Sequence, residues 1–473
     1  MKNPSALKPP FYYLAAIPVI IAVNYYSAVS FYFRYDTFVW LDKTIFDPMN
    51  FSYFFSYNKA SAYFTPAGNL LFFLLFKMFK LAATPYHVFL ILIHIFNSII
   101  VYRLICRITR NAPAAFAASV MFGISPAGVE PVVYIAALHH SLATAFVLSG
   151  FLSFMNFKEG RGRKYYLLAF LFYLSGLLTK QTSIIMPALL LIYEWLKEKK
   201  GFRRKELAKY LPFFLASAIY MMTNKAVAEA NIAYSGIQAM YYQPGGHIFL
   251  KYLSYLKFML LPFDAISGLL RGETGISLDT LYASAKNILF VCFIIIFYFR
   301  WRKSKDAVFF LIWATVCLFP VLPFKFSAQS RYAYLPSIGF YAALAVVLCQ
   351  AEELKKRSRR FAVLGLIIIY CCASQAVLNI YRSDYAFWKG LTSAAGKYCP
   401  AALSSGPARL YIMDFPRLAV SRDDEIGSAM RVALNNPLLE VKAIYSAQKA
   451  AINKDNRTCF LKYRYRRLWP ASE

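Results

Sequence analysis

The chain has 473 residues, of which 59% are hydrophobic and 16% charged, and its mean hydropathy is +0.45. Soluble domains are nearer half apolar and a quarter charged. The apolar residues recur as runs of membrane-span length between residues 11 and 380. This pattern excludes a soluble enzyme, a disordered protein, a single-span receptor and an outer-membrane barrel. We therefore expect an all-α, polytopic helical membrane protein.

The basic residues give a net charge of +30 and cluster in short loops between the apolar runs. Such clustering is the positive-inside pattern of membrane proteins, so we expect no nucleic-acid partner. Placing the clusters inside predicts about eleven spans, in a range of about 10–13. The expected spans are 11–31, 86–106, 112–124, 132–157, 165–179, 182–197, 208–224, 285–300, 306–323, 332–350 and 361–380.

Two further apolar segments, 67–81 and 247–263, would put basic clusters on the wrong side if they crossed the membrane. Each segment gathers its polar residues on one helical face, which is typical of helices that lie in the membrane interface. The polar residues are Asn69, Lys77 and Lys80 in the first segment, and His247, Lys251, Ser254 and Lys257 in the second. We predict two outer interfacial helices.

The predicted membrane domain covers 1–380, with an outer loop at 32–66 and an outer segment at 225–284. A small soluble tail, 381–473, follows on the outer face. Its stretches 424–434 and 438–453 predict helices, so the tail is expected to be helical. It also holds Cys399 and Cys459, whose pairing in an oxidising compartment stays open.

Three acidic residues near the outer edge are candidate catalytic groups: Asp36, Asp42 and Glu130. A carboxylate there can act as a general base or hold a metal. The alternative for each is a solvated loop acid or a helix N-cap. The sequence establishes no cofactor with certainty; a divalent metal is possible, and Asp36 and Glu130 would hold it.

Lys180 and Arg331 are cations at outer membrane edges, against the positive-inside trend. Such cations suit a lipid phosphate, although ordinary snorkelling is the alternative. Five other polar residues are candidates for the substrate groove or for hydrogen-bonded packing: His87, His94, Asn97, His139 and His140. Their spacing matches no zinc motif.

A series of segments then carries a family resemblance, in order along most of residues 31–400. They are FRYDTFVWL, YFTPAGNLLFFLLF, PYHVFLILIHIFNSIIVYRL, FGISPAGVEPVVYIAALHHSLATAFVL, LLTKQTSIIMPALLLIYEWL, SAQSRYAYLPSIGF and NIYRSDYAFWKGLTSAAGKYCP. The series resembles the C-type (GT-C) glycosyltransferases, and in pattern the transmembrane-and-tetratricopeptide mannosyltransferases and their bacterial relatives. Three positions where the family carries acids are Thr37, Gln181 and Ser330 here.

The resemblance implies transfer of a hexose such as mannose from a polyprenyl-phosphate donor to a protein or glycan acceptor on the outer face. Asp36 would be the base, Asp42 and Glu130 further carboxylates or metal ligands, and Lys180 and Arg331 the donor-phosphate ligands. We expect a bacterial inner membrane with a periplasmic tail, or an ER membrane with a luminal tail in a eukaryote. A flippase of lipid-linked glycans and an inactive relative acting as an assembly partner remain alternatives.

Overall fold

The structure is a computed structural model, and it describes most of the chain. The described residues are 11–47, 63–197, 207–230, 242–260, 287, 290, 304–325, 329–350, 356–399, 406–413, 423–443, 458–464 and 467–470. The predicted span at 285–300 falls almost entirely outside these residues.

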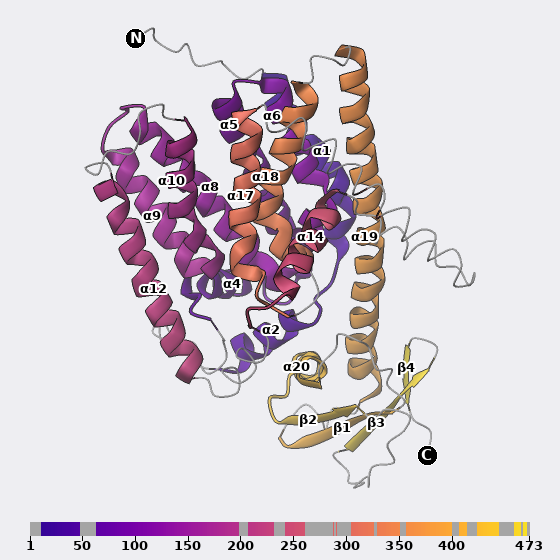
Figure 1. The fold of residues 1–473 in the computed structure, drawn as a ribbon. Helices are drawn as coiled ribbons and strands as arrows, with labels where there is room; N and C mark the ends of the chain where they lie inside the picture. Colours follow the sequence, from indigo (N-terminus) through magenta and orange to yellow (C-terminus); the bar gives the residue numbers. More distant parts are fainter. Residues whose placement is uncertain are drawn as a thin grey trace.

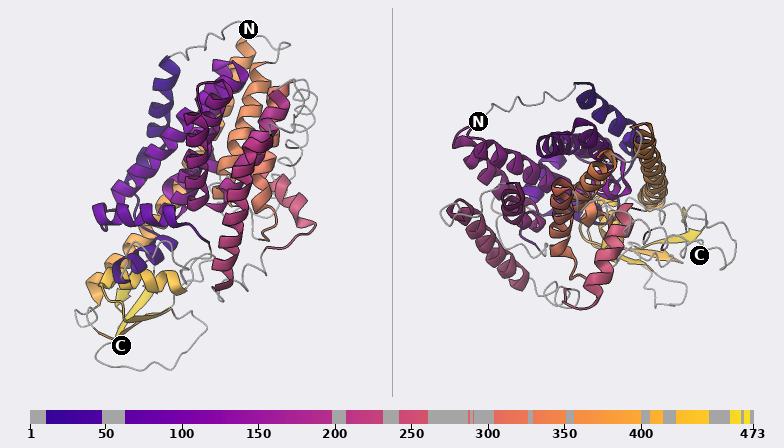
Figure 2. Two further views of the ribbon diagram at one scale, coloured as in Figure 1. Left: turned by 90° about the vertical axis from the view of Figure 1, so that its left-hand side faces the viewer. Right: turned by 45° about the horizontal axis from the view of Figure 1, so that its top comes forward.

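Helices form one long bundle, and a small sheet-containing tail is attached to one end of it (Figures 1 and 2). The α-helices of the bundle are α1 (Phe11–Tyr25), α2 (Asp36–Phe46), α4 (Pro66–Phe79), α5 (Ala83–Thr109), α6 (Ala112–Ile124), α7 (Pro126–Val133), α8 (Leu138–Lys158), α9 (Lys164–Thr179), α10 (Met186–Lys197), α12 (Leu211–Ala230), α14 (His247–Leu260), α17 (Lys305–Leu318), α18 (Ser330–Cys349) and α19 (Lys356–Tyr398). Short 3-10 turns are η1 (Tyr26–Ser30), η2 (Ile135–Ala137), η3 (Gln181–Ile185), η4 (Ala208–Tyr210) and η5 (Phe319–Val321).

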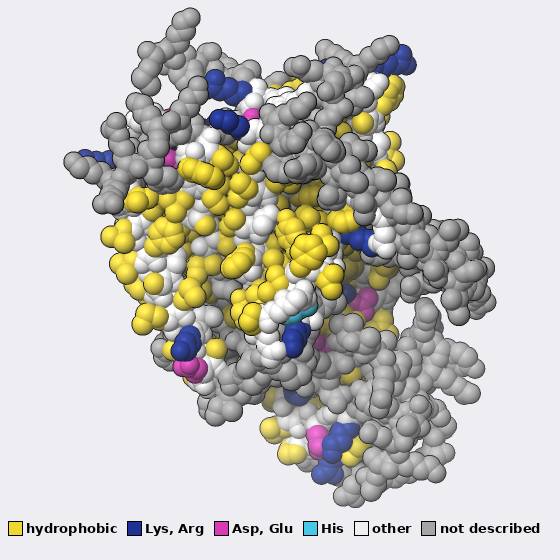
Figure 3. All heavy atoms as spheres, in the orientation of Figure 1, with side chains coloured by type: hydrophobic (Ala, Val, Ile, Leu, Met, Phe, Trp, Pro, Cys, Tyr) yellow, Lys and Arg dark blue, Asp and Glu magenta, His cyan; other side chains and the backbone are white. Residues whose placement is uncertain are grey.

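Every predicted span except the one at 285–300 coincides with a described helix, so the all-α polytopic prediction is confirmed for the bundle. By length and apolarity, five described helices can cross a membrane, or six if α6 and α7 count as one bent span. The total of eleven spans stays a prediction. Apolar side chains cover the middle of the bundle surface, as Figure 3 shows, and such a belt suits a lipid environment.

The bend between α6 and α7 is set by sequence. Pro126 follows Ser125, and a residue before proline is driven out of the helical region. Ser125 accordingly has an extended backbone (φ −73°, ψ 151°), and the two helices meet at 55°. The bend delivers Glu130 and Tyr134 to the tail-side end of the bundle.

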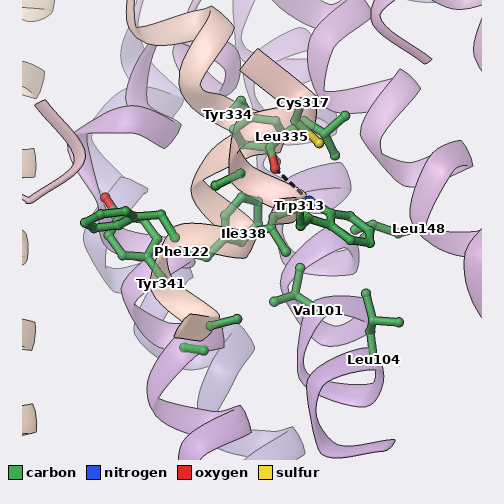
Figure 4. Close-up of a cluster of buried hydrophobic side chains, with 14 of the residues drawn as sticks. Val101, Leu104, Phe122, Leu148, Trp313, Cys317, Tyr334, Leu335, Ile338 and Tyr341 are labelled. Carbon is green, nitrogen blue, oxygen red and sulfur yellow. Dashed lines mark hydrogen bonds between the residues drawn. The ribbon is translucent and has the colours of Figure 1, made fainter. Parts of the chain in front are cut away.

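The bundle core is aromatic and closely packed. Figure 4 shows Trp313 of α17 beside Tyr334 and Ile338 of α18, with its indole N–H donating to the Leu335 carbonyl at 3.3 Å. Gly339 of α18 lets α17 approach: a Cβ there would lie 2.3 Å from the Phe310 carbonyl oxygen.

We expect Gly339→Ala to destabilise the protein by about 1–3 kcal/mol, because backbone rather than a mobile side chain blocks the methyl group. Thermal unfolding of the purified protein in detergent measures the change. Gly365→Ala on α19 is the matched control, since nothing lies within 4 Å of its Cβ position. Equal unfolding temperatures for the two variants would contradict this packing.

The helix α14 differs from the predicted interfacial helix over 247–263. Its first turn is anchored to the turn after η5, where Lys251 bonds the Phe324 carbonyl. Its last carbonyls, at Met259 and Leu260, accept hydrogen bonds from Tyr341 and Tyr370, halfway along α18 and in α19. The helix therefore slants into the bundle, and part of its polar face contacts protein.

The prediction of a purely helical tail is wrong. The tail contains β1 (Ala408–Met413), α20 (Asp423–Leu434), β2 (Leu439–Ala443), β3 (Thr458–Arg464) and β4 (Arg467–Pro470). The sheet order is β2-β1-β3-β4, with β1 parallel to β2 and β3, and with β4 antiparallel to β3. The expected helix at 424–434 is α20, which makes the crossover between two parallel strands. The expected helix at 438–453 begins instead with strand β2.

No break separates the predicted domains at residue 380, because α19 is a single helix of 43 residues. Its first half is the predicted last span, and its second half packs against the tail through Trp388 and Leu391. The tail is therefore held by a continuous helix.

Candidate active site

Asp36 begins helix α2 at the tail-side end of the bundle. The Asp36 carboxylate accepts a hydrogen bond from the Tyr134 hydroxyl at 2.9 Å. The backbone N–H of Asp36 donates to the hydroxyl oxygen of Tyr134 at 3.1 Å. The preceding residue, Tyr35, has φ 44°, a conformation that side-chain-bearing residues rarely adopt. Such strain persists where the surroundings enforce it, often at functional sites. Among the described residues, no cation pairs with the Asp36 carboxylate.

Arg34 is a functional candidate that the sequence reasoning missed. It is 9% exposed and forms an ion pair with Asp384 of α19. Four aromatic rings surround its guanidinium, at 4.1–5.3 Å from the ring centroids: Tyr35, Tyr134, Tyr381 and Tyr385. Because Tyr134 also bonds Asp36, this cage fixes the position of the carboxylate. The one available signal was a lone arginine two residues before Asp36.

Glu130 of α7 is hydrogen-bonded to the first two residues of α18. It accepts hydrogen bonds from the Ser330 hydroxyl at 2.6 Å and from the Arg331 N–H at 3.1 Å. The Arg331 guanidinium adds a third bond, at 3.2 Å. A carboxylate is favourable at a helix N-terminus because the helix dipole is positive there. Ser330, at a position where the related family carries an acid, thus donates to one.

Lys180 lies between α9 and η3, with its ammonium 5.4 Å from the Tyr63 ring centroid. Burial, and then the nearby Arg331 charge, lower the pKa of Lys180 to about 8. The described part of the chain offers this lysine no ion-pair partner. Arg331 also interacts electrostatically with Asp36. Arg331 thus contacts Glu130 and interacts electrostatically with both Asp36 and Lys180, and the catalytic roles of the four residues stay predictions.

A cavity of about 510 Å³ opens beside Lys180 and Arg331, between α12, η3 and η5. Seven of the fifteen residues in its wall carry aromatic rings or carboxamides, namely Tyr63, Tyr220, Tyr242, Phe324, Tyr332, Gln181 and Asn224, and the wall also holds Lys225 and Glu229. Tyr63 lies under Lys180, and the guanidinium of Arg331 is 5.5 Å from the ring centroid of Tyr332. An apolar groove of about 360 Å³ adjoins this cavity at Tyr220 and runs between α9 and α12.

Three of the proposed groove residues face protein instead. His94 bonds the Tyr334 hydroxyl at 2.7 Å and the Gly123 carbonyl at 2.9 Å, and Asn97 donates to Tyr334 and Ser141. His87 bonds the Tyr32 carbonyl at 3.2 Å. Because all three side chains are fully buried, they hold helices together, which was the alternative for them.

His139 and His140 lie nearer the site. His139 bonds Asn69 of α4 at 3.2 Å, and its ring fills the space that a Cβ at Gly68 would need. His140 packs edge-on against Tyr332, which lines the cavity. Both side chains are under 9% exposed, so they pack inside the protein next to the site.

Asp42 is engaged by the tail. Its carboxylate accepts hydrogen bonds from Ser428 at 2.8 Å and from two nitrogens of Arg431, both residues of α20. This pairing satisfies the carboxylate and locks α2 to the tail. The geometry favours a docking role over the expected catalytic role.

Asp42→Asn should raise hydrogen exchange of the α20 amides by about 10- to 100-fold, because a charge-assisted pair contributes roughly 1.5–3 kcal/mol. Exchange measured by mass spectrometry on the full chain tests this. Glu440→Gln, which removes an exposed pair with Arg409, serves as the control. Unchanged α20 exchange together with lost turnover would instead return Asp42 to the catalytic set.

The described residues contain no group of three or more His, Cys, Asp or Glu side chains placed to hold a metal. Asp36 and Glu130 each face donors of the protein, namely Tyr134 in one case and Ser330 with Arg331 in the other. The donor set that these two carboxylates present therefore does not fit a metal ion.

Comparison with known proteins adds to this geometry. No family model and no curated protein matches the sequence. Among solved structures, the chain is similar to ArnT from Cupriavidus metallidurans, with a TM-score of 0.51 and 12% identity over 91% of this chain and 86% of ArnT. It is also similar to the oligosaccharyltransferase AglB from Archaeoglobus fulgidus, with a TM-score of 0.50 and 13% identity, covering 91% of this chain and 64% of AglB.

Both proteins are polytopic glycosyltransferases of the GT-C fold. At this level of identity the similarity concerns the fold. The chain has the GT-C fold, which confirms the resemblance read from its ordered segments.

Proposed function

We propose that the protein is a membrane glycosyltransferase that moves a sugar from a polyprenyl-phosphate donor to an acceptor on the extracytoplasmic face. A hexose such as mannose is the donor sugar, as the sequence resemblance suggests, and the acceptor is a protein or a glycan. The GT-C fold supports this class, and the AglB structure is itself a complex with an inhibitory peptide and a dolichol-phosphate.

The observation that supports the proposal is that one arginine, Arg331, interacts electrostatically with both a lysine and a carboxylate that have no ion-pair partner among the described residues. Lys180 has no anionic partner in the described chain, and Asp36 has no cationic one. Arg331 interacts electrostatically with both and forms an ion pair with Glu130 at 3.2 Å. The donor is a phosphate diester, and its negative charge would lie at Lys180 and Arg331. The anomeric carbon of its sugar is a few bonds away and would point toward Asp36.

The transfer step follows from this arrangement. The Asp36 carboxylate takes the proton of the acceptor hydroxyl while the hydroxyl oxygen attacks the anomeric carbon. The bond between that carbon and the phosphate oxygen breaks, and its electron pair leaves with polyprenyl phosphate. Lys180 and Arg331 stabilise the additional phosphate charge, which is the largest kind of catalytic contribution. Attack opposite the leaving group inverts the anomeric configuration.

The two hollows suit the two ends of the donor. Aromatic rings and carboxamides in the 510 Å³ cavity match the stacking and hydrogen-bonding surfaces of a sugar. The adjoining groove is lined by aliphatic and aromatic side chains of α9 and α12, and it suits a prenyl chain. The tail would then face the periplasm of a bacterium, or the ER lumen in a eukaryote.

Donor binding is expected to weaken as the pH rises through about 8, because the free Lys180 ammonium loses its proton there. The donor KM should rise with pH in this range, while kcat changes less, because bound phosphate holds the proton on Lys180. Lys180→Arg keeps the charge and should flatten the profile. An identical rise of KM in wild type and Lys180→Arg would contradict the assignment.

Turnover of defined donors tests the function itself. The purified full chain, in liposomes, is offered radiolabelled polyprenyl-phosphate mannose and, separately, glucose, with a membrane extract as acceptor source. Release of polyprenyl phosphate with one donor is the expected result.

The same preparation separates the alternatives. Movement of labelled donor across the liposome bilayer without release would favour the flippase. Donor binding without release or movement would favour the inactive relative. That alternative is based on Thr37, Gln181 and Ser330, which stand where the family that the chain resembles carries acids. Thr37 is buried, Gln181 lines the cavity and Ser330 bonds Glu130, so all three lie at or near the site.

A further inference from the structure

Two cysteines meet where helix α19 joins the tail sheet. Cys399 follows the last residue of α19, and its N–H donates to the Ala395 carbonyl at 3.0 Å. Cys459 lies in β3, opposite Leu410 of β1. The two buried residues are free thiols that interact with each other inside one apolar cluster, although 60 positions separate them in the chain. Contact in space between residues so far apart in sequence is set by the fold of the tail.

The surroundings of the pair limit its chemistry. Cys399 and Cys459 are 9% and 6% exposed, inside an apolar cluster that includes Trp388, Leu410 and Leu461. Contact with Cys459 and burial raise the pKa of the Cys399 thiol, whereas contact with Cys399 lowers the pKa of Cys459, so Cys459 is the thiol that loses its proton more easily. The described residues place no further His, Cys, Asp or Glu there to complete a metal site. Oxidation of the two thiols to a disulfide remains.

The distribution of cysteines supports the same conclusion. The chain has eight, and the other six lie in or beside the predicted spans, where cysteine serves as a small apolar residue. The tail has only this pair. Disulfides form in proteins or domains that face an oxidising compartment.

We propose that Cys399 and Cys459 form a disulfide on the extracytoplasmic face. Each thiol gives up its hydrogen and a sulfur–sulfur bond forms between them. The two electrons and two protons pass to the disulfide of an oxidising thiol–disulfide exchange protein, which becomes a dithiol. This inference rests on the tail-outside orientation used in the proposed function, but not on glycosyl transfer.

The bond has a structural consequence for the site. It closes a loop from the end of α19 through β1, α20 and β2 to β3. Within that loop lies Arg431, which pairs with Asp42 of α2, and Asp36 begins the same helix. The disulfide thus links the sheet to α19. Two other residues of α19, Asp384 and Tyr385, contact Arg34.

Thiol counting on the full chain tests the proposal. Membranes are denatured in a polyethylene-glycol maleimide, with or without prior reduction, and adducts are counted as mobility shifts. Wild type should carry six adducts before reduction and eight after it, because two of its eight cysteines are paired. Cys399→Ser and Cys459→Ser should each carry seven in both conditions, since the surviving partner is released.

Cys106→Ser on α5 is the control, and it should keep a difference of two adducts on reduction. Peptide mapping by mass spectrometry of unreduced wild type should find Cys399 linked to Cys459. Eight adducts for unreduced wild type would overturn the proposal, and so would a reducible pair that survives in both tail variants. Since the readout is a thiol count, a chain without transferase activity still gives a clear result.

Discussion

Asp36→Asn is expected to lower the rate of sugar transfer by about 10²–10⁴-fold while the protein still folds and binds donor, because general-base catalysis contributes factors of that size. Asparagine can still accept the Tyr134 hydrogen bond, so the local structure is kept. It cannot take the proton of the acceptor. Initial rates of polyprenyl phosphate release at saturating donor measure the loss.

Glu159→Gln is the matched control for this variant. Glu159 follows α8 at the opposite end of the bundle. Its partly exposed carboxylate forms an ion pair with Arg107. Its removal should leave transfer unchanged. Wild-type rates for Asp36→Asn would show that another group is the base, and unfolding of the variant would point to a structural role.

Lys180→Met should raise the donor KM by about 10- to 100-fold, because a hydrogen bond to a charged group contributes roughly 1.5–3 kcal/mol. Methionine keeps much of the apolar stem against Tyr63 and removes only the charge. The acceptor KM should stay within about twofold, since no acceptor phosphate is involved. Steady-state kinetics with each substrate varied in turn separate the two effects.

Lys164→Met provides the comparison, because Lys164 begins the same helix, α9, at the end away from the site. That variant should keep the wild-type donor KM. Equal increases in the donor and acceptor KM of Lys180→Met would indicate a general distortion of the cavity and would contradict a specific phosphate contact.

Much of the site could be predicted because membrane topology restricts where loops can meet. Asp36, Glu130, Lys180 and Arg331 belong to four different segments, yet all four lie at span ends assigned to the same side. Once the basic clusters fix the orientation, these ends lie on one side of the membrane, where they can meet. The structure places all four at the tail-side end of the bundle.

The errors concern residues whose partners are remote in sequence. Asp42 looks like a free loop acid until α20, 386–389 positions later, supplies Ser428 and Arg431. Arg34 becomes notable only through Asp384, 350 positions away. A sequence pattern shows which side chains are polar, but it does not show whether a cavity or another helix faces them.

The tail sheet was missed for a related reason. Strand β2 is short and precedes an Ala-rich segment, so its local pattern favours a helix. Its strand conformation depends on parallel pairing with β1 across the α20 crossover. Such pairing depends on tertiary context, which local periodicity does not encode.

In the proposed complex, a polyprenyl-linked phosphate binds between Lys180 and Arg331 with its sugar toward Asp36. The most direct measurement is a cryo-EM structure of the full chain with a non-hydrolysable polyprenyl-phosphonate sugar. The phosphonate is predicted to contact both cations, with the sugar in the cavity beside Tyr332 and Gln181 and the prenyl chain between α9 and α12. A headgroup bound elsewhere, or a sugar pointing away from Asp36, would contradict the claim.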